Sequence, residues 1–511
     1  MATKRTKNRQ FLPRLESLER RDAMTGLSAV LSTAGQLTIS GTSTGTYQIN
    51  ETSSAISVAG VSGSFADAKV KSIVVNLDGG NDLVLLNTGS VKGQVALNVP
   101  ITVVGGAGND DVRLANNTDV YFTGVANSLA VTAQGAVTLD KLAITWADQN
   151  IQTAAIRTLV KTDVTAGAVT RNEMIALFTQ VEKAGAVTAA EFNDLKLIAG
   201  DAALFGSQTY VQTLTDDVVL GNAANSTYLG GKLGNLAAGS SATTLTNLVG
   251  KWFQGTDLPL GTSDWGPTYS YANANGNLFG SSGPLYTDIN QGGLGDCYFL
   301  SALAATAKST PNAITSMFIV NGDGTYTVRF YTASGKADYV TVNTALPVSN
   351  GQLVFAGMGN FAGSKSNVLW VALAEKAFVE WHATGLENEG AAASAPNEYT
   401  AISGGYMGTA LSEITDRVNV SFNSFTASNS FTNFVSAFKA GSLIEFGSDS
   451  NPTLSTVVGG HAYAVVGYNA TTQTVTLFNP WGINNGSSYP GLITLSWAQI
   501  QANFSYWDRV I

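Results

Sequence analysis

The sequence predicts an α+β protein in which a β-rich domain and a small helical segment precede a larger domain of mixed helices and strands. Over residues 26–140, apolar residues alternate with polar ones between Gly, Asn and Asp turns, which is typical of short strands. Over residues 141–205, apolar residues recur at the spacing of three and four that an amphipathic helix requires. Seven of the eight tryptophans lie from Trp252 onward, which indicates a further region that begins near residue 251.

The composition excludes several classes of protein. Charged residues make up 12% of the 511 residues and apolar residues 44%, which favours ordered domains over a disordered chain. The formal net charge is −9, and seven of the 27 basic residues fall within the first 22 residues, so the rest of the chain has no basic footprint for nucleic acid. A single cysteine excludes a disulfide framework and a thiolate-rich metal site.

Residues 1–25 form a basic N-terminus of the kind that exported proteins carry. No long apolar run exists in the chain, so we expect no transmembrane helix, and no apolar stretch follows the basic residues as in a standard signal peptide. Residues 15–24 resemble the "LExLExR" pattern of exported bacterial surface proteins, and the alternative is a short charged amphipathic helix. We therefore expect an extracellular or cell-surface location in a bacterium, with attachment through residues 1–205.

The first region predicts short strands in a β-helix-like or β-roll-like domain or in a sandwich. Leu37 and Ile39 would share one face of a strand. Residues 105–112, Gly-Gly-Ala-Gly-Asn-Asp-Asp-Val, fit the haemolysin-type pattern that binds calcium between stacked turns, with Asp110 as a candidate ligand. Residues 78–84 are a partial copy of that pattern. Because a calcium β-roll needs several consecutive repeats, a pair of ordinary Gly/Asn/Asp turns is the favoured interpretation.

Two capped helices account for the helical segment. Thr170 with Glu173 forms a capping box, and an apolar stripe at helical spacing follows it. Thr188 with Glu191 repeats this signature. A glycine and a valine precede each glutamate at the spacing of an EF-hand loop, but the other ligand positions lack the required carboxylates, so helix caps are favoured over calcium sites. Residues 206–250 are rich in Gly, Asn, Ser and Thr and predict a connector.

Cys297 is the chemically distinctive residue because it is the only cysteine and it begins an apolar helical run. At a helix N-terminus, the positive end of the helix dipole favours the thiolate, which is the nucleophilic form. Asp296 stands where a helix cap is expected. The alternative is a buried cysteine that acts as a small apolar residue, since most free cysteines are of this kind.

Of the two histidines, His461 is the candidate partner of Cys297. His382 follows a tryptophan in a helix-like run, which predicts a surface or packing role. His461 follows two glycines and opens an apolar strand, which would be a rigid support for the imidazole. A short turn and a second strand lead to Asn479, and antiparallel pairing across that turn would bring its side-chain oxygen to the ring of His461. Together the three residues favour a catalytic triad over three separate core residues.

Three motifs resemble the signatures of the calpain family of papain-like cysteine proteases. They are Gln-Gly-Gly-Leu-Gly-Asp-Cys ending at Cys297, Gly-His-Ala-Tyr around His461 and Asn-Pro-Trp-Gly starting at Asn479. The resemblance extends over residues 281–511 and keeps the family's order of Cys, His and Asn. It implies a two-lobed papain-like core over residues 251–511, with a first lobe to about residue 405 and a second lobe from there to the end.

The resemblance also implies a role for four residues. Cys297 would be the nucleophile, His461 the general base and then the general acid, and Asn479 the residue that orients His461. Gln291 would donate, with the backbone N–H of Cys297, to the oxyanion that forms on the substrate carbonyl. The implied reaction is hydrolysis of a peptide bond through a thioester acyl-enzyme, and the implied partner is a protein or peptide substrate.

Calcium is a cofactor of the family, but the residues that would bind it are incomplete here. Gly283 and Asp288 match ligand positions of the family's first lobe. Val368 stands where the family has a glutamate, and residues 483–486, Ile-Asn-Asn-Gly, stand where its second lobe has carboxylates. We therefore expect no required cofactor, with calcium as the alternative, and control that differs from that of the calcium-switched members.

Two other functions are compatible with some of these features. A non-proteolytic cell-surface adhesion or binding protein would use the protease core only as a scaffold, but none of the four implied catalytic residues is missing. An acyltransferase of the transglutaminase type would have an acid in place of Asn479 and would not need Gln291. A calpain-like cysteine endopeptidase is therefore the predicted function.

Overall fold

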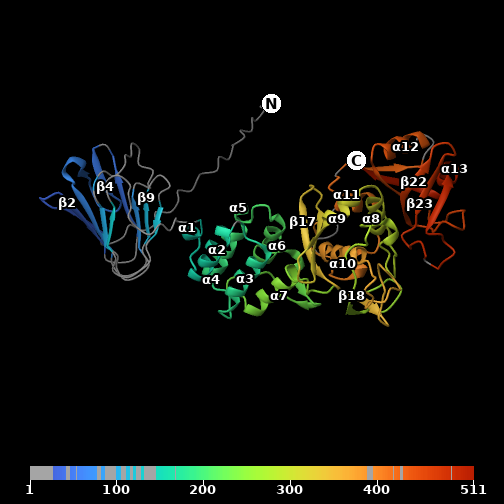
Figure 1. The fold of residues 1–511 in the computed structure, drawn as a ribbon, viewed down its shortest axis with the longest axis horizontal. Helices are drawn as coiled ribbons and strands as arrows, with labels where there is room; N and C mark the ends of the chain where they lie inside the picture. The colour runs from blue at the N-terminus through green and yellow to red at the C-terminus, as the bar shows by residue number, and fades with distance from the viewer. Residues whose placement is uncertain are drawn as a thin grey trace, which may run out of the picture. The chain divides into compact units, whose positions relative to one another are not determined.

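The structure of the chain is a computed structural model. It describes residues 27–511 except 42–45, 53, 78–81, 87–98, 100, 105–110, 115–118, 122–127, 132–145, 167, 388–394, 418, 426–429 and 485. The basic N-terminus over residues 1–25 therefore lies outside the described residues. The chain divides into two compact units, residues 1–149 and residues 150–511 (Figure 1). Helices and sheets are both abundant, so the predicted α+β class is confirmed.

The described part of the first unit is built of two β-sheets. One has the strand order β1-β2-β6-β8-β11 and the other the order β10-β9-β7-β3-β4-β5. The elements are β1 (Ser28–Leu31), β2 (Gln36–Ser40), β3 (Thr46–Glu51), β4 (Ala55–Val58), β5 (Phe65–Ala66), η1 (Asp67–Lys69), β6 (Ser72–Asn76), β7 (Leu83–Leu86), β8 (Ile101–Val104), β9 (Asp111–Leu114), β10 (Asp119–Tyr121) and β11 (Ser128–Val131).

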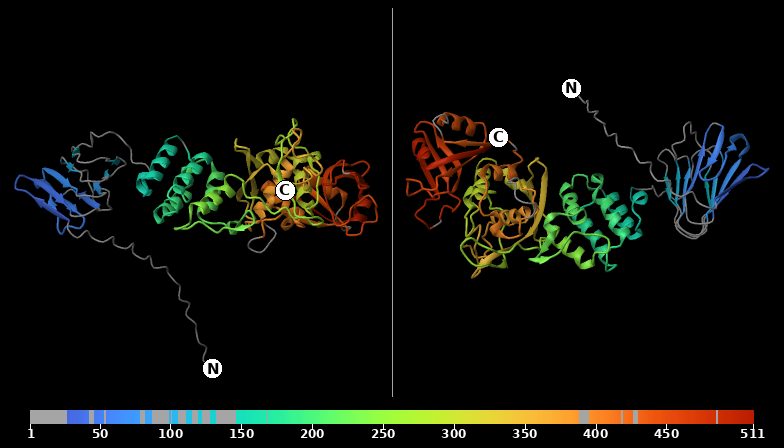
Figure 2. Two further views of the ribbon diagram at one scale, coloured as in Figure 1. Left: turned by 90° about the horizontal axis from the view of Figure 1, so that it is seen from below. Right: turned by 180° about the vertical axis from the view of Figure 1, so that it is seen from behind.

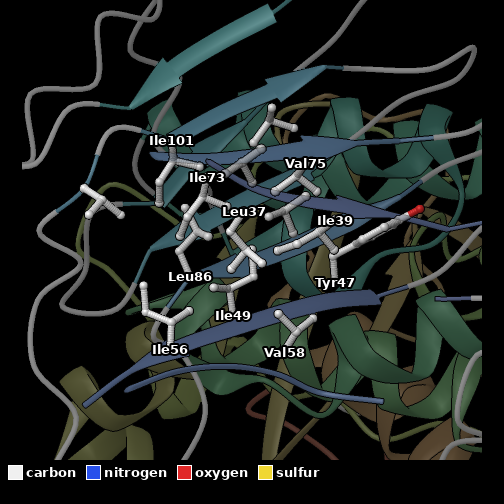
Figure 3. Packing of buried hydrophobic residues seen from close by; sticks show 14 of the residues in the cluster. Leu37, Ile39, Tyr47, Ile49, Ile56, Val58, Ile73, Val75, Leu86 and Ile101 are labelled. Atoms are coloured by element: carbon white, nitrogen blue, oxygen red, sulfur yellow. The ribbon is translucent and has the colours of Figure 1, made fainter. Parts of the chain in front are cut away.

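Successive passes of the chain lie side by side in parallel and add one strand to each sheet. In the first sheet, Leu37 pairs with Ile73 and Ile73 pairs with Ile101. The second sheet repeats this pattern through β3, β7 and β9. Alternate apolar side chains of both sheets point between them and form one buried core (Figure 3). This stacking of passes is the arrangement of a parallel β-solenoid, and it explains why the strands alternate apolar and polar residues.

The two glycine-rich turns with the calcium-binding pattern lie outside the described residues. These turns comprise residues 78–81 and 105–110, and they include the candidate ligand Asp110. The strands that follow them, β7 and β9, pair in parallel with Val84 opposite Val112. The calcium hypothesis for Asp110 therefore stays a prediction.

The second unit begins with a group of helices. They are α2 (Ala154–Ala166), α3 (Arg171–Glu182), α4 (Ala189–Ala199), α5 (Ala202–Phe205), α6 (Thr209–Val219) and α7 (Ala242–Trp252), with α1 (Trp146–Asn150) at the boundary between the units. The capping boxes of α3 and α4 are both present. Glu173 accepts a hydrogen bond from the backbone N–H of Thr170 at 2.7 Å, and Glu191 accepts one from Thr188 at 2.9 Å. Both glutamates are therefore engaged as caps.

Residues 206–250, which we expected to be a connector, contain the helices α6 and α7. Val211, Leu214 and Val218 are buried and recur at helical spacing along α6. The many Thr, Asn and Gly residues around them obscure this short stripe in the sequence. Both helices pack on β17 (Ala337–Asn343), so the helical group belongs to the same compact unit as the residues that follow it.

The rest of the second unit combines helices with small sheets and one six-stranded sheet. The sheets have the strand orders β12-β13, β14-β18-β19, β15-β16-β17 and β20-β25-β21-β22-β23-β24. The elements besides β17 are η2 (Ala223–Ser226), β12 (Thr227–Tyr228), β13 (Gly231–Lys232), β14 (Ser270–Asn273), η3 (Tyr286–Asp288), α8 (Cys297–Ser309), α9 (Pro311–Met317), β15 (Phe318–Val320), β16 (Thr325–Tyr331), β18 (Ala345–Ser349), β19 (Gln352–Leu353), α10 (Trp370–His382), η4 (Tyr399–Ile402), α11 (Met407–Thr415), β20 (Val420–Ser424), α12 (Phe431–Lys439), β21 (Leu443–Ser448), β22 (Ala462–Asn469), β23 (Thr474–Phe478), β24 (Leu492–Ser496), α13 (Trp497–Asn503) and β25 (Phe504–Val510).

Helix α8 is the element on which this part of the unit is assembled. Every residue from Tyr298 to Ala307 is buried, because α10, α11 and the strands β21 and β22 pack around the helix. Phe299 of α8 stacks on Phe378 of α10 with 4.0 Å between the ring centroids. Within the second unit, the six-stranded sheet, coloured red, and the teal-to-green helices α2–α7 lie at opposite ends, with the yellow-to-orange part between them (Figure 2). No helix in the described part of the chain is long and apolar enough to cross a membrane.

Candidate active site

Cys297 is the first residue of α8 and is partly exposed, whereas the next ten residues are buried. The N-terminus of the helix therefore presents the thiol at an edge of the packed core. Asp296 occupies the cap position but makes no capping hydrogen bond. Its carboxylate instead accepts a hydrogen bond from Gln291 Nε2 at 3.2 Å and shares one with Glu375 of α10. Asp296 therefore stands at the predicted cap position, but buried polar neighbours rather than the helix N–H groups engage its carboxylate.

His461 and Asn479 meet at one end of the β22–β23 hairpin. His461 immediately precedes β22 and Asn479 immediately follows β23, and antiparallel pairing of Ala464 with Phe478 brings the two ends together. His461 Nε2 lies 2.8 Å from Asn479 Oδ1. The same oxygen accepts a hydrogen bond from the backbone N–H of Trp481 at 3.1 Å, which identifies it as the acceptor and leaves the proton on Nε2. Nδ1 is thus the atom that remains to accept a proton.

The surroundings of His461 hold the ring in place. The Trp481 ring lies 5.3 Å from the imidazole, centroid to centroid, at a tilt of 57°. Tyr463 meets the imidazole edge-on at 5.1 Å. The backbone N–H of His461 donates to Ser448 Oγ at 2.9 Å, and the backbone N–H of Ser448 donates to the His461 carbonyl oxygen at 2.9 Å. Ser448 ends β21 and belongs to none of the sequence motifs, so only the strand pairing reveals this support.

Packing of α8 on β22 brings Cys297 next to the peptide that follows His461. The backbone N–H of Ala462, the residue after His461, donates a hydrogen bond to the Cys297 sulfur. Helix α8 contacts β22 along its length, so this bond is part of an extended interface. The structure thus gathers the three residues of the predicted triad at the junction of α8 and the β22–β23 hairpin.

Burial governs the protonation of Cys297 and His461. Burial raises the pKa of the Cys297 thiol to about 11. The hydrogen bond from the Ala462 N–H acts in the opposite direction, because it favours the thiolate. Burial lowers the pKa of His461 to about 4, although the bond to Asn479 favours the imidazolium. Both effects favour the neutral thiol and the neutral imidazole in the resting site. A thiolate–imidazolium pair would depend on the mutual attraction of the two charges.

Gln291 lies beside α8, but its amide is already engaged. Its Nε2 donates to Leu294 O at 2.8 Å and to Asp296 Oδ1 at 3.2 Å. Its backbone N–H donates to Pro480 O at 2.8 Å, which ties it to the segment that carries Asn479. Gln291 Oε1 is buried and has no hydrogen-bond partner among the described residues. Donation from Nε2 to an oxyanion therefore requires the amide to release one of its two present acceptors.

A buried pair of acids behind Gln291 was not predicted from the sequence. Burial raises the pKa of Asp296 to about 7, and burial together with the charge of Asp296 raises the pKa of Glu375 well above its ordinary value. Glu375 also accepts from the backbone N–H of Ala356 at 3.1 and 3.0 Å. One proton shared between the two acids satisfies both. The signal in the sequence is the glutamate of the Leu-Ala-Glu-Lys run over residues 373–376, which is the wrong residue type for an apolar helix core.

Asp288, one of the two proposed calcium ligands, is engaged in other contacts through one carboxylate oxygen. Asp288 Oδ2 accepts hydrogen bonds from the indole of Trp370 at 2.8 Å and from the backbone N–H of Leu285 at 2.9 Å. Gly283 forms a tight turn through a bond to Gly280 O at 3.0 Å. In the part of the chain that the structure describes, no group of three or more His, Cys, Asp or Glu residues is placed to hold a metal. The donor set around Asp288 does not fit the six to eight oxygen ligands that calcium takes.

His382, the second histidine, lies at the end of α10 and is buried. Its Nδ1 pairs with the carboxylate of Glu387, which follows the helix. A packing role is therefore what its contacts indicate, and it takes no part in the junction of α8 and β22.

Comparison with known proteins agrees with this geometry. Residues 263–503 match the family described as calpain family cysteine protease. The calpain-type cysteine protease ADL1 of rice, Oryza sativa subsp. japonica, is 30% identical over 213 residues, which are 38% of this chain and 9% of the rice protein. The catalytic subunit of human calpain-1 is 28% identical over 221 residues, 39% of this chain and 28% of the human protein. Mouse calpain-8 is 27% identical over 219 residues, with the same shares of 39% and 28%.

Residues 263–503 are a calpain-family cysteine protease domain, which the matched profile and these relatives define together. The predicted family is confirmed over that range. The chain spans less than a third of the length of these curated relatives. The residues before 263 fall outside the matched range.

Proposed function

We propose that the protein is a calpain-like cysteine endopeptidase whose triad is Cys297, His461 and Asn479, held in a two-lobed papain-like core. The 2.8 Å contact between His461 Nε2 and Asn479 Oδ1, at the point where α8 presents Cys297, is the observation that carries the proposal. A histidine with its proton fixed on Nε2 has a free Nδ1 to accept the thiol proton. The substrate class is protein or peptide.

The reaction follows from these positions. His461 Nδ1 takes the proton of the Cys297 thiol, and the sulfur forms a bond to the scissile carbonyl carbon. The C–N bond of the peptide breaks, and the imidazolium returns the proton to the leaving amine, which leaves a thioester on Cys297. Water then attacks the thioester with His461 as base, which releases the acid and restores the thiol. The backbone N–H of Cys297 and the Gln291 amide would stabilise the oxyanion in both steps.

Alkylation tests the nucleophile directly because Cys297 is the only cysteine in 511 residues. A small iodoacetamide-type reagent should label the native full-length protein at Cys297 near neutral pH, and Cys297→Ala should abolish cleavage of unfolded casein. We expect the labelling rate to be the same in calcium and in EDTA, given the contacts of Asp288. Cleavage that persists in Cys297→Ala would overturn the proposal. A folded protein whose Cys297 resists the reagent would favour the non-proteolytic scaffold.

The two histidines offer a matched pair of variants, since each residue is 7% exposed. His461→Ala should lower kcat by roughly 100- to 10,000-fold, because it removes the general base. His382→Ala removes an equally buried ring that bonds to Glu387 and should leave kcat within a few fold in the folded protein. Equal losses in both variants would show that His461 has only a packing role.

We further propose that the protein acts outside the cell or at the surface of a bacterium, with residues 1–205 serving for attachment. The support is the basic, export-type pattern of residues 1–25 and the low fraction of charged residues, 12% of the chain. Fractionation of producing cells tests this, since protein confined to the cytoplasm would exclude it.

A further inference from the structure

A buried serine–glutamate pair joins the helix of Cys297 to the sheet of His461. Ser301 lies four residues after Cys297, one turn further along the same face of α8. Its hydroxyl donates to Glu445 Oε1 of β21, and both side chains are completely buried. The two residues are 144 positions apart in the sequence, so this bond is a direct tie between separate parts of the domain.

Strand β21 carries this tie on to His461. Glu445 lies opposite Ala464 of β22, and Gly447 lies opposite Ala462, the residue after His461. Three residues after Glu445, Ser448 holds the backbone of His461 through two hydrogen bonds. Strand β21 therefore bonds to α8 through Glu445 and to His461 through Ser448. The position of Cys297 relative to His461 depends on both ends of β21.

A second acid lies next to Glu445 on the neighbouring strand. Asp508 of β25 is its direct cross-strand partner, and its side chain is also buried. Asp508 Oδ2 accepts from the backbone N–H of Gly408, near the start of α11, at 3.1 Å. Neither Glu445 Oε2 nor Asp508 Oδ1 has a hydrogen-bond partner among the described residues.

Two buried carboxyl groups on directly paired strand residues cannot both be ionised without a large cost in folding free energy. The α11 N-terminus supplies an N–H and the positive end of the helix dipole to Asp508, so the negative charge is best placed there. The proton then resides on Glu445 Oε2, the oxygen that Ser301 does not use. Burial, with the nearby charge of Asp508, raises the pKa of Glu445 well above its ordinary value, and burial raises that of Asp508 to about 6.

We propose that Glu445 is a positioning residue for the peptidase reaction proposed above: as a neutral buried acid it binds Ser301 and so locks α8, with Cys297, onto the strand that supports His461. Its neutrality matters because an ionised Glu445 would raise the pKa of the Cys297 thiol and oppose formation of the thiolate. The other titratable groups that interact with this site are Asp508 and Tyr506 on β25, Cys297 on α8 and Tyr406, which precedes α11.

The test compares Ser301→Ala, Glu445→Gln and Ser309→Ala by the pH profile of Cys297 alkylation and by kcat and KM on a peptide substrate. Ser301→Ala removes the hydrogen bond to Glu445. We expect the alkylation midpoint, the pH at which the rate of Cys297 alkylation is half-maximal, to rise by about one pH unit as Cys297 moves away from His461. We expect kcat to fall by roughly 10- to 100-fold with KM nearly unchanged, because a small misplacement of a reacting group costs this much. Ser309→Ala makes the same change at the exposed end of α8 and should leave both measurements unchanged.

Glu445→Gln keeps the size of the side chain and an oxygen that accepts from Ser301, and it is always neutral. We expect it to match the unaltered protein in both the alkylation profile and kcat. Ser301→Thr retains the hydroxyl and should restore most of the activity that Ser301→Ala loses, which a loss of folding alone would not predict.

Two outcomes overturn the inference. An unchanged profile and kcat in Ser301→Ala would exclude positioning through this tie, and an alkylation midpoint that falls in Glu445→Gln would show that Glu445 is ionised. The alkylation profile requires no substrate, so it separates this inference from the proposed function. If the unaltered protein cleaves no peptide but Ser301→Ala still shifts the profile, the function fails and the positioning stands.

Discussion

At the scale of single residues, the imidazole of His461 is fixed by contacts of three kinds. Asn479 bonds its Nε2 at 2.8 Å, the Trp481 ring packs against the imidazole, and Ser448 bonds to the backbone of His461. Each contact restricts the motion of the imidazole, so less conformational entropy has to be lost when the ring acts as a general base. His461 and Asn479 directly flank β22 and β23, and Ser448 ends β21, so the paired strands fix the positions from which these residues orient the base.

Replacement of Asn479 by alanine should lower kcat by roughly 10- to 100-fold, because the ring loses its orientation and its defined tautomer. The bond to Asn479 raises the pKa of His461, while burial lowers it to about 4. Without Asn479 the pKa falls further, so the acid limb of the kcat profile should move to lower pH. Asn484→Ala, an exposed change in the same loop, is the control. A kcat within twofold of the unaltered protein in Asn479→Ala would contradict the assignment.

At the scale of secondary-structure elements, helix α3 fastens the N-terminal helical group to the protease domain. Arg171, the first residue of α3, is buried and forms an ion pair with Asp323 at 2.9 Å. The same guanidinium donates to the carbonyl oxygen of Phe253 and to Thr325 at 3.3 Å. The Phe178 ring of α3 meets the Phe253 ring edge-on at 5.5 Å. The helical group is thus packed into the same core as the protease sheet β15-β16-β17.

Arg171→Ala should lower the free energy of unfolding of the second unit by about 3 kcal/mol. The substitution removes the guanidinium and leaves the Phe253 carbonyl oxygen and Asp323 without this hydrogen-bond donor. Urea denaturation followed by tryptophan fluorescence measures this. Lys183→Ala, an exposed change at the end of the same helix, should stay within about 0.5 kcal/mol of the unaltered protein. If both variants unfold at the same urea concentration, α3 is not a structural part of the protease unit.

At the scale of the whole molecule, the described part of the second unit buries more carboxyl groups than cations, although Arg171, Lys251 and Lys376 are buried as well. Burial raises the pKa of Asp296 to about 7, that of Glu380 to about 8 and that of Asp508 to about 6. These acids are protonated in the fold at a pH at which the unfolded chain would be ionised. The stability that they contribute is therefore complete at low pH and is lost as the pH rises through the folded-state values.

The free energy of unfolding should accordingly fall by several kcal/mol between pH 5.5 and pH 8, since each raised pKa unit is worth about 1.4 kcal/mol. His461 acts in the opposite sense: burial lowers its pKa from 6.5 to about 4, so its contribution is lost as the pH falls between those values. The three acids together outweigh His461, so the free energy of unfolding should still fall as the pH rises. Urea titrations at the two pH values, followed by tryptophan fluorescence, measure the change. Equal or higher stability at pH 8 would show that the acids are ionised in the fold.

The chemistry of the candidate site was largely determined by the sequence. Cys297, His461 and Asn479 stand in motifs whose local structure is predictable, because a helix start and a hairpin depend on neighbouring residues. The capping boxes at Thr170 and Thr188 were predictable for the same reason. Such features need no knowledge of distant contacts.

Only the tertiary structure decided which polar groups are buried together. Ser301 and Glu445 lie 144 residues apart, and neither stands in a motif. Asp296 stands at the expected cap position, but its carboxylate bonds to Glu375. Residues 206–250 contain helices that pack on β17. The physical reason is the same in each case. The protonation of an acid and the stability of a short helix depend on how much water the rest of the chain excludes from them, and that is a property of the folded whole.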